Sequence, residues 1–321
     1  MRREIITFAL LLISALATSA QTDGNKSSAE KIVFEGELRY HSEENYNKFI
    51  IDNTFGMSYN GVRNTRYIIK GDKVLYIDEC THVYTLIDGN TVTLYSDLIN
   101  KGISFEQYNG YAKAMLNIFS KEGKSYMGHK MQPTLYRFEN EGTTTLMERT
   151  ADYHKGRIED ATASTDFDIY AFSSFVMPKA YTALFLRGIE IDGIIGKTVW
   201  KQTNMIGDVM KDISDKTKRK IYKKMSKIAG TKVTPSYDLK AYCMSKLTDI
   251  KERVVDDSEF SIPSNIKIYT ASEGSIRESA SSITRLTDFY KENHAYLLNH
   301  NMYPTQVNRE VVFSIDEEWD F

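Results

Sequence analysis

Cysteine is almost absent from this chain, which contains only Cys80 and Cys243 among 321 residues. A fold held together by several disulfides is therefore excluded, and so are redox and zinc sites that need a C-x-x-C pair. The two thiols are far apart in sequence, so it stays open whether they form a single disulfide. No cysteine follows the N-terminal apolar run, which excludes acylation there of the kind found in bacterial lipoproteins.

Signature motifs of common enzymes are also missing. The sequence contains no G-x-S-x-G, no H-E-x-x-H and no complete phosphate-binding loop, because Gly123-Lys124-Ser125 lacks the upstream glycine. The six histidines are scattered, and adjacent acids such as Glu43 and Glu44 point to opposite faces of a strand. We therefore expect that the protein is not an enzyme and uses no cofactor.

The nearest approach to a metal site is formed by Asp78, Cys80 and His82. On a strand these residues share one face and offer a carboxylate, a thiolate and an imidazole. The alternative is a strand that ends here and turns into a loop. Because three ligands of mixed type do not complete a four-ligand site, we favour the loop and expect no bound metal.

Net charge and long apolar runs are scarce as well. The formal charge is −2, which does not indicate a nucleic-acid partner. After residue 20 no stretch reaches the ~20 apolar residues that a transmembrane helix needs, so we expect a protein that does not span a membrane. With 21 tyrosines against 5 prolines, the composition favours β-sheet over a flexible chain.

The one long apolar run lies at the N-terminus. Met1-Arg2-Arg3 is a basic start, residues 5–16 are almost entirely apolar, and small residues follow to Ala20. This order is typical of a secretory signal peptide, cleaved near Ala20 or, alternatively, after Ala17. A retained membrane anchor is disfavoured because the run is too short. We therefore expect a periplasmic or secreted protein.

The folded part is predicted to begin after a polar leader over residues 21–30, which we expect to be disordered. From Ile32 to Tyr40 apolar and polar residues alternate, as in a strand with one solvated face. Gly71-Asp72 and Gly89-Asn90 each separate a pair of apolar segments and predict two tight hairpins. The first half is therefore predicted to be an antiparallel meander.

The inner strands of this meander are apolar at odd and even positions alike. The pattern places Tyr67, Ile69, Val74 and Tyr76 on one face and Ile68, Leu75 and Ile77 on the other. Both faces must then be covered by protein, or one face must line a cavity.

The rest of the chain shows a mixture of strand and helix patterns. They predict a short helix over 111–119, a hairpin turning at Asn140-Glu141-Gly142, strands near 167–175, 183–191 and 197–202, extended chain over 239–255 continuing through 260–268, and helices over 208–228 and 275–300. The helix over 208–228 is acidic at its start and basic at its end, which suits the helix dipole. Its basic face is either solvated, which we favour, or a site for an anionic partner.

The C-terminus combines large apolar groups with acids. Trp319 and Phe321 lie among Asp316, Glu317, Glu318 and Asp320. This composition buries poorly in a core and suits a basic pocket on a protein partner, so both residues are candidate partner-binding residues. The alternating pattern also occurs in the last strand of outer-membrane barrels, but the crowded charges and the two predicted helices disfavour a barrel wall.

Four segments together resemble the LolA/LolB-like periplasmic lipoprotein-carrier superfamily, and most of all its relatives of unknown function. They are Val33–Tyr40 (VFEGELRY), Arg66–Val74 (RYIIKGDKV), Asp88–Tyr95 (DGNTVTLY) and Ile250–Pro263 (IKERVVDDSEFSIP). The similarity spans about residues 32–268. The basic helix, the C-terminal helix and the tail depart from the pattern, and no residue matches those that the carriers use to take or hand over cargo.

The resemblance implies an α+β fold, in which a curved antiparallel β-sheet forms an incomplete barrel with helices packed on its concave side. The C-terminal helix would be an extension of that fold. The chain would then divide into a signal peptide (1–20), a leader (21–30), a LolA-like β-rich domain (31–270), and a C-terminal helix with an acidic tail (271–321). In that superfamily the concave side encloses a cavity for acyl chains.

Our first hypothesis is a non-enzymatic envelope protein that binds a lipid or a lipoprotein acyl chain by burial of apolar surface. The candidate apolar-ligand-binding residues are Phe34, Leu38, Tyr67, Ile69, Val74, Tyr76 and Leu94. The alternative is an interaction protein with a filled core, which docks an envelope protein partner through the basic helix or the acidic tail.

Overall fold

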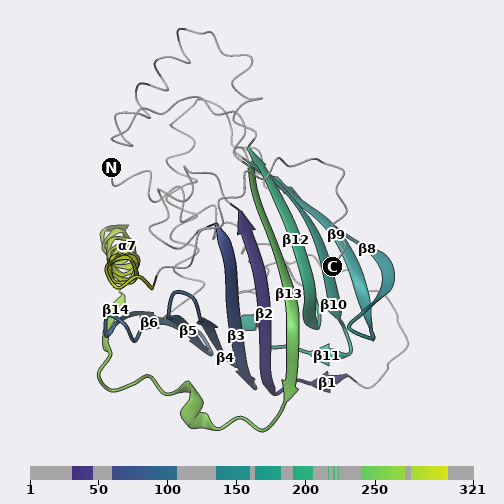
Figure 1. Ribbon diagram of the computed structural model, residues 1–321, viewed down its shortest axis with the longest axis horizontal. Coiled ribbons are helices and arrows are strands. Elements are labelled where there is room, and N and C mark those ends of the chain that lie inside the picture. Colours follow the sequence, from purple (N-terminus) through teal and green to yellow (C-terminus); the bar gives the residue numbers. More distant parts are fainter. Residues whose placement is uncertain are drawn as a thin grey trace.

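A single large β-sheet dominates the structure, and Figure 1 shows its strongly curved shape. The computed structural model describes residues 31–45, 60–106, 135–159, 163–181, 191–204, 240–271 and 276–302, together with Lys216, Lys220 and Lys223. The sheet has 12 strands in the order β14-β7-β6-β5-β4-β3-β2-β13-β12-β10-β9-β8. Because β14 and β8 end this order without pairing to each other, the sheet is open.

The strands follow one another along the chain mostly as neighbours in space. They are β2 (Gly36–Asn45), β3 (Gly61–Lys70), β4 (Lys73–Asp78), β5 (Val83–Asp88), β6 (Thr91–Ser96), β7 (Lys101–Phe105), β8 (Leu135–Leu146), β9 (Arg149–Glu159), β10 (Ala163–Phe172), β12 (Ile194–Asn204), β13 (Lys240–Glu252) and β14 (Lys267–Ala271). Neighbouring strands are antiparallel except β14 and β7, which are parallel. The predicted meander is therefore confirmed for β3 to β7, with turns at Gly71-Asp72 and Gly89-Asn90.

The predicted strand from Ile32 to Tyr40 is interrupted. β1 (Ile32–Val33) leaves the large sheet and pairs in parallel with β11 (Phe175–Val176). Gly36 starts β2 with a φ of +149°, and a Cβ atom there would lie 2.1 Å from the Lys251 carbonyl oxygen. Glycine therefore lets the chain approach β13 closely as it changes direction.

The predicted hairpin at Asn140-Glu141-Gly142 is wrong. β8 runs through these residues, and its register with β9 shifts between Asn140 and Gly142. Gly142 has a φ of +114°, and its amide donates to the Asn140 side chain at 2.8 Å. An Asn-Glu-Gly sequence suits a β-bulge as well as a turn, and here it forms a bulge. The chain turns instead after Leu146, at Met147 and Glu148, which both have positive φ.

The segment after β13 differs from the extended chain that the sequence predicts. Residues Asp257–Phe260 form a short 3-10 helix, η1. Asp256 is its N-cap and accepts from the Ser258 amide at 2.8 Å, while the Glu259 carboxylate accepts from the Asp256 amide at 3.2 Å. This reciprocal capping box explains why the chain coils at this point before it re-enters the sheet as β14.

Both faces of the central strands are covered, as the two-sided apolar pattern predicts. On the outer, convex face Ile68, Leu75 and Ile77 form a buried cluster with Val255 and Phe260 of the segment around η1. The concave face, which we call the inner face, carries a larger buried cluster. Its members on the central strands and β1–β2 connection are Phe34, Leu38, Tyr40, Tyr67, Ile69 and Val74, and further members come from residues 151–195 and Leu247.

A long helix, α7 (Ile276–Asn299), confirms the predicted C-terminal helix and lies beside β7 and β14 on the inner side of the sheet (Figure 1). Arg285 lies over the Tyr269 ring of β14 at 4.0 Å, and Lys101 of β7 pairs with Glu292. Phe289 and Leu297 are buried. The α+β class and the curved, incomplete barrel are thus confirmed.

Several sequence predictions lie outside the described residues. They are the signal peptide with its cleavage near Ala20, the leader, the helix over 111–119, the strand over 183–191, and the tail with Trp319 and Phe321. Of the helix predicted over 208–228, Lys216, Lys220 and Lys223 are helical and exposed.

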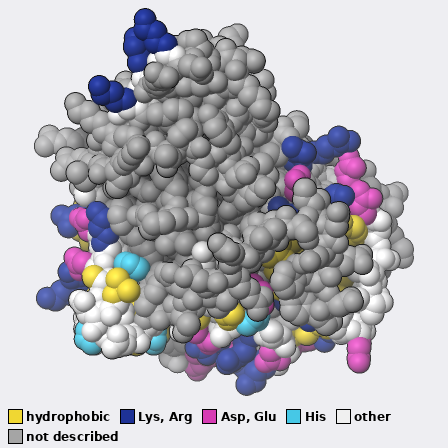
Figure 2. Space-filling model, turned by 45° about the horizontal axis from the view of Figure 1, so that its top comes forward, with side chains coloured by type: hydrophobic (Ala, Val, Ile, Leu, Met, Phe, Trp, Pro, Cys, Tyr) yellow, Lys and Arg dark blue, Asp and Glu magenta, His cyan; other side chains and the backbone are white. Residues whose placement is uncertain are grey.

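Along the left, lower and right margins of the face shown in Figure 2, side chains of both charges occur.

The segment around η1, which covers the outer face of β3 and β4, leads to a stability prediction. Phe260→Ala removes a buried ring from between the η1 segment and the sheet, and should lower the free energy of unfolding by ~3–5 kcal/mol in urea titrations. Val254→Ala is the matched control, because Val254 lies six residues earlier in the same segment and is 88% exposed. That change should stay within ~0.5 kcal/mol. A loss below about 1 kcal/mol for Phe260→Ala would show that this segment does not close the outer cluster.

Candidate functional site

The inner face of β2 to β7 brings most of the sequence-predicted ligand-binding residues together. Leu38, Tyr67, Ile69 and Val74 are buried in one cluster with Phe34, and Tyr76 packs against that cluster. Leu94 lies on the same face but farther along the sheet, on β6, and is half-buried. The structure thus gathers all seven candidates on one side of the sheet. Their role in holding a ligand stays a prediction.

The strand register arranges the inner face in rows that cross the sheet. A central row contains Ile250, Leu38, Tyr67, Tyr76, Thr85, Leu94 and Ile103. A flanking row contains Ile69, Val74, Ile87, Val92 and Phe105, and is entirely apolar. The row on the opposite flank contains Tyr40, Thr65, Asp78, Val83, Ser96 and Lys101. The inner face therefore changes from apolar to polar along the strand direction.

Tyrosines occupy the middle of this gradient, and of these Tyr40, Tyr67 and Tyr181 are buried while Tyr76 is half-buried. The ring of Tyr67 contacts those of Tyr40, Tyr76 and Tyr181, with centroids 5.5, 5.1 and 5.4 Å away. The Tyr40 and Tyr181 hydroxyls are 2.5 Å apart. Tyr40 also donates to the Ile195 carbonyl at 2.8 Å, and Tyr181 accepts from the Ile195 amide at 2.9 Å.

Burial sets the protonation state of this aromatic group. It raises the pKa of Tyr40, Tyr67, Tyr76 and Tyr181 well above the ordinary value, because a phenolate is poorly solvated there. The hydroxyls therefore stay protonated at neutral pH and act as hydrogen-bonding groups at the middle of the inner face.

A buried ion cluster marks the polar end of the inner face. Arg63 on β3 lies between Glu44 of β2, with Nε 3.0 Å from Oε1, and Asp78 of β4, with Nη1 2.9 Å from Oδ2. The side chains of Arg63, Glu44 and Asp78 are 14%, 10% and 4% exposed. Charges this deeply buried persist because they pair with one another.

Asp78 also explains the Asp78-Cys80-His82 pattern. Its second carboxylate oxygen accepts from the Cys80 amide at 2.9 Å and the Thr81 amide at 3.1 Å, which organises the turn between β4 and β5. His82 has a φ of +55° and lies 3.6 Å from Asp97. The loop interpretation is thus confirmed. Among the residues that the structure describes, no cluster of three His, Cys, Asp or Glu side chains could hold a metal ion.

Helix α7 is attached beside this polar end by one buried amide. Asn293 is 2% exposed, donates to the Thr81 carbonyl at 2.9 Å and accepts from the Ser96 hydroxyl at 2.7 Å. One turn earlier, burial raises the pKa of Tyr290 to about 12. The helix therefore contributes polar contacts to the same end of the inner face as Arg63.

The two cysteines do not form a disulfide. Cys243 is buried on β13, whereas Cys80 is half-buried in the turn after β4. The Cys80 sulfur lies 3.4 Å from the Asn64 amide nitrogen, which donates to it. The open question from the sequence is thus answered in favour of separate thiols.

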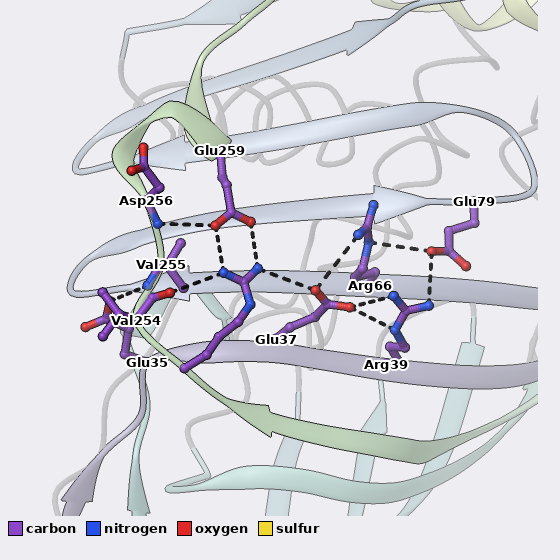
Figure 3. A network of polar contacts seen from close by, with 10 residues as sticks. Glu35, Glu37, Arg39, Arg66, Glu79, Val254, Val255, Asp256 and Glu259 are labelled. Atoms are coloured by element: carbon purple, nitrogen blue, oxygen red, sulfur yellow. Dashed lines mark hydrogen bonds and ion pairs between the residues drawn. The ribbon is translucent and has the colours of Figure 1, made fainter.

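A second polar cluster lies on the outer face, where Figure 3 shows a chain of alternating acids and arginines. Buried Glu37 of β2 lies 2.7 Å from Arg39, 3.5 Å from Arg253 and 3.9 Å from Arg66. Arg253 also binds Glu259 of η1 through both Nη atoms, at 2.7 and 2.6 Å.

The outer cluster fastens the η1 segment to the sheet. The Glu35 carboxylate accepts from the Val255 amide at 2.8 Å, and Arg253 binds η1 and β2 at once. The Glu259 side-chain contact with Arg253 holds the pKa of Glu259 below its ordinary value of 4.5. The contacts of Arg253 and Glu35 join the η1 segment to the strands beneath it, whereas those of Glu37 with Arg39 and Arg66 join residues of the sheet itself. We therefore assign the outer cluster a structural role.

The sequence analysis missed both ion clusters. Arg63 and Glu44 keep the parity of Tyr67 and Tyr40, so strand alternation alone would have placed them on the inner face. Their pairing could not be found this way, because it depends on which strands are neighbours. The other predicted functional residues, Trp319 and Phe321, lie outside the described residues.

Comparisons with known proteins give only distant similarities. No protein family and no curated protein matches the sequence. One similar structure is an uncharacterized conserved protein from Thermus thermophilus, with 10% identity, a TM-score of 0.34, and coverage of 74% of this chain and 91% of that chain. Another, from Vibrio parahaemolyticus, is described as an outer membrane lipoprotein-sorting protein domain, with 9% identity, a TM-score of 0.24, and coverage of 81% and 97%. At TM-scores below 0.5, neither similarity supports a conclusion about the function of this chain.

The Arg253–Glu259 contact generates a pH prediction. A carboxyl group whose pKa is lowered by folding stabilises the fold above its unfolded pKa, and this contribution is lost as the pH falls through the lower, folded value. The free energy of unfolding should therefore fall as the pH drops below about 4.5, the ordinary Glu259 value. Glu259→Gln should be less stable at pH 7 and should lose less stability on acidification.

The measurement is urea unfolding at a series of pH values between neutrality and the onset of acid unfolding. Glu252→Gln is the control, because Glu252 is an exposed carboxylate at the end of β13 beside the same segment. It should keep the acid dependence of the unchanged protein. Equal acid slopes for Glu259→Gln and the unchanged protein would contradict a linkage through Glu259.

Proposed function

We propose that this protein is an exported, non-enzymatic binding protein that holds an apolar ligand, a lipid or acyl chain, against the inner face of its curved sheet. The polarity gradient of that face is the observation that carries the proposal. The row from Ile69 to Phe105 is entirely aliphatic and aromatic, and the row with Thr65 and Asp78 carries polar groups. The side chains of the apolar row are buried in the structure, so a ligand chain would take the place of the side chains that now cover them. A ligand with a chain and a polar end matches this order, with its chain along the apolar row.

The two faces of the central strands support this choice of face. Described residues around Val255 and Phe260 close the outer apolar set of β3 and β4. The inner set lies on the concave side, where Tyr76 and Leu94 are half-buried, as Tyr84 and Leu86 are on the outer face, so the concave shape and not the exposure distinguishes the inner face. A ligand that covers half-buried apolar side chains gains ~25 cal/mol for each Å² of apolar surface removed from water.

The site chemistry favours binding over catalysis. The four central tyrosines are protonated at neutral pH, and their hydroxyls suit hydrogen bonding more than proton transfer. Arg63 pairs with Asp78, and the other carboxylate oxygen of Asp78 organises the β4–β5 turn. A role in maintenance of the cell envelope is consistent with a binding protein of this kind.

Export is the part of the proposal that rests on residues 1–20. Their basic start and apolar run are those of a secretory signal peptide. N-terminal sequencing of the protein recovered from the periplasmic or secreted fraction should give a chain that starts at Gln21. Recovery of soluble protein that still begins at Met1 would refute export.

Ligand binding is tested by a matched pair of leucines on opposite faces. Leu94 of β6 faces inward and Leu86 of β5 faces outward, and both are half-buried. Leu94→Gln should weaken binding of a fluorescent fatty acid about tenfold, because the ligand loses an apolar contact of ~1.5 kcal/mol. Leu86→Gln should leave the dissociation constant unchanged. Titration of probe fluorescence gives both values.

Mass spectrometry of the natively purified protein completes this test, since a carrier should retain lipid that solvent extraction releases. If no lipid is retained and the unchanged protein does not bind the probe, the inner face is a filled core. The protein would then be assigned to the alternative class of interaction proteins. Equal weakening by both leucine variants would show that the probe binds without preference for the inner face.

A further inference from the structure

The two ends of the large sheet are very different. At one end β14 spans five residues, and Arg285 of α7 lies over its Tyr269 ring. At the other end β8 spans 12 residues, and no described strand pairs with its outer edge. From residue 139 to 145 every side chain of β8 is exposed. A long exposed edge presents a row of backbone donors and acceptors to any added strand.

The regular part of this edge is short and well defined. β8 keeps an unbroken register with β9 from Leu135 to Asn140, and the bulge then shifts it before Gly142. Phe138 turns inward over Gly156, where a Cβ atom would lie 2.0 Å from its ring. The Phe138 ring therefore packs over β9 and does not extend beyond β8, and no strand of the described part of the chain pairs with the outer edge. An added strand would pair best with residues 135–140.

The charges of this segment are self-complementary. Arg137 and Glu139 share one face of β8, with Nε 2.8 Å from Oε1, and their side chains are 73% and 54% exposed. A two-fold axis through Phe138 sets a second β8 antiparallel to the first. It places Arg137 opposite Glu139 of the partner subunit, and the reverse contact follows by symmetry.

Neighbouring registers are disfavoured by the same charges. An axis through residue 137 would set Arg137 opposite the partner's Arg137, and an axis through residue 139 would oppose two glutamates. Like charges directly opposite one another destabilise a strand pair. The pattern Arg-Phe-Glu thus selects one register.

We propose that the outer edge of β8 is a dimerisation surface that pairs with β8 of a second copy of this chain, in the register centred on Phe138. The two sheets then continue into one another across the two-fold axis. In the sheet, β2, β13, β12, β10 and β9 lie between β8 and the strands β3 to β7, so the backbone edge of β8 is distinct from the apolar row that would hold a ligand. The Phe138 side chain nevertheless packs against the same inner cluster as Ile69 and Val74. The alternative is that these charges prevent any strand from pairing with the edge of β8, and this alternative predicts a monomer.

Sedimentation equilibrium over a concentration series tests the proposal with a charge swap. The unchanged protein should be a dimer, and Arg137→Glu should weaken the dimer about tenfold or more, since both symmetric contacts become repulsive. The double variant with Arg137→Glu and Glu139→Arg should restore it, because opposite charges face each other again. Lys201→Glu, an equal charge change at an exposed side chain of β12, should remain dimeric.

Hydrogen exchange gives a readout on the unchanged protein. Backbone amides of residues 135–140 that point away from β9 should exchange more slowly at high protein concentration than at low. A monomer throughout the series overturns the proposal. So does a dimer that tolerates Arg137→Glu, or concentration-dependent protection that lies elsewhere in the chain.

Discussion

The need to bury both faces of β3 and β4 is the constraint on which the rest of the structure depends. Ile68, Leu75 and Ile77 point one way and Ile69 and Val74 the other, so this part of the sheet cannot lie on the protein surface. The chain meets the constraint by passing the segment around Val255 and Phe260 beneath the sheet on its way from β13 to β14. That passage also explains why β14 pairs with β7 in parallel. Parallel neighbours need a crossover connection, and the segment from β13 to β14 crosses the outer face of the sheet before β14 begins.

Polar contacts fix the positions of the two elements that cover the sheet, η1 on its outer face and α7 on its inner face. On the outer face, Arg253 joins Glu37 to Glu259 and so fixes η1 over the apolar cluster. On the inner face, Asn293 joins α7 to the turn after β4 and to the end of β6. A buried amide or guanidinium is costly unless its partners are in place, so each of these contacts also specifies one position of its element. Apolar burial therefore supplies the driving force for folding, and these few polar contacts fix where η1 and α7 lie on the sheet.

Local signals in the sequence predict the meander and α7 because each depends on neighbouring residues. Gly71 and Gly89 sit between apolar segments, and the helix follows one apolar stripe. Gly142 misleads because a positive φ suits a bulge as well as a turn, and only the β9 register separates the two. The inner-face residues were predictable as a face, from alternation. The contact of Arg63 with Glu44 and Asp78 was not, because it depends on the neighbours that the strands acquire in the sheet.

The seam between β2 and β13 has a consequence for the order of folding. It pairs Leu38 with Ile250, so the middle of the sheet is built from opposite ends of the β-rich chain. The hairpins from β3 to β7 need only local contacts and can form early, whereas this seam has to await the synthesis of β13. The middle of the sheet is therefore completed only when nearly all of the β-rich chain has been synthesised.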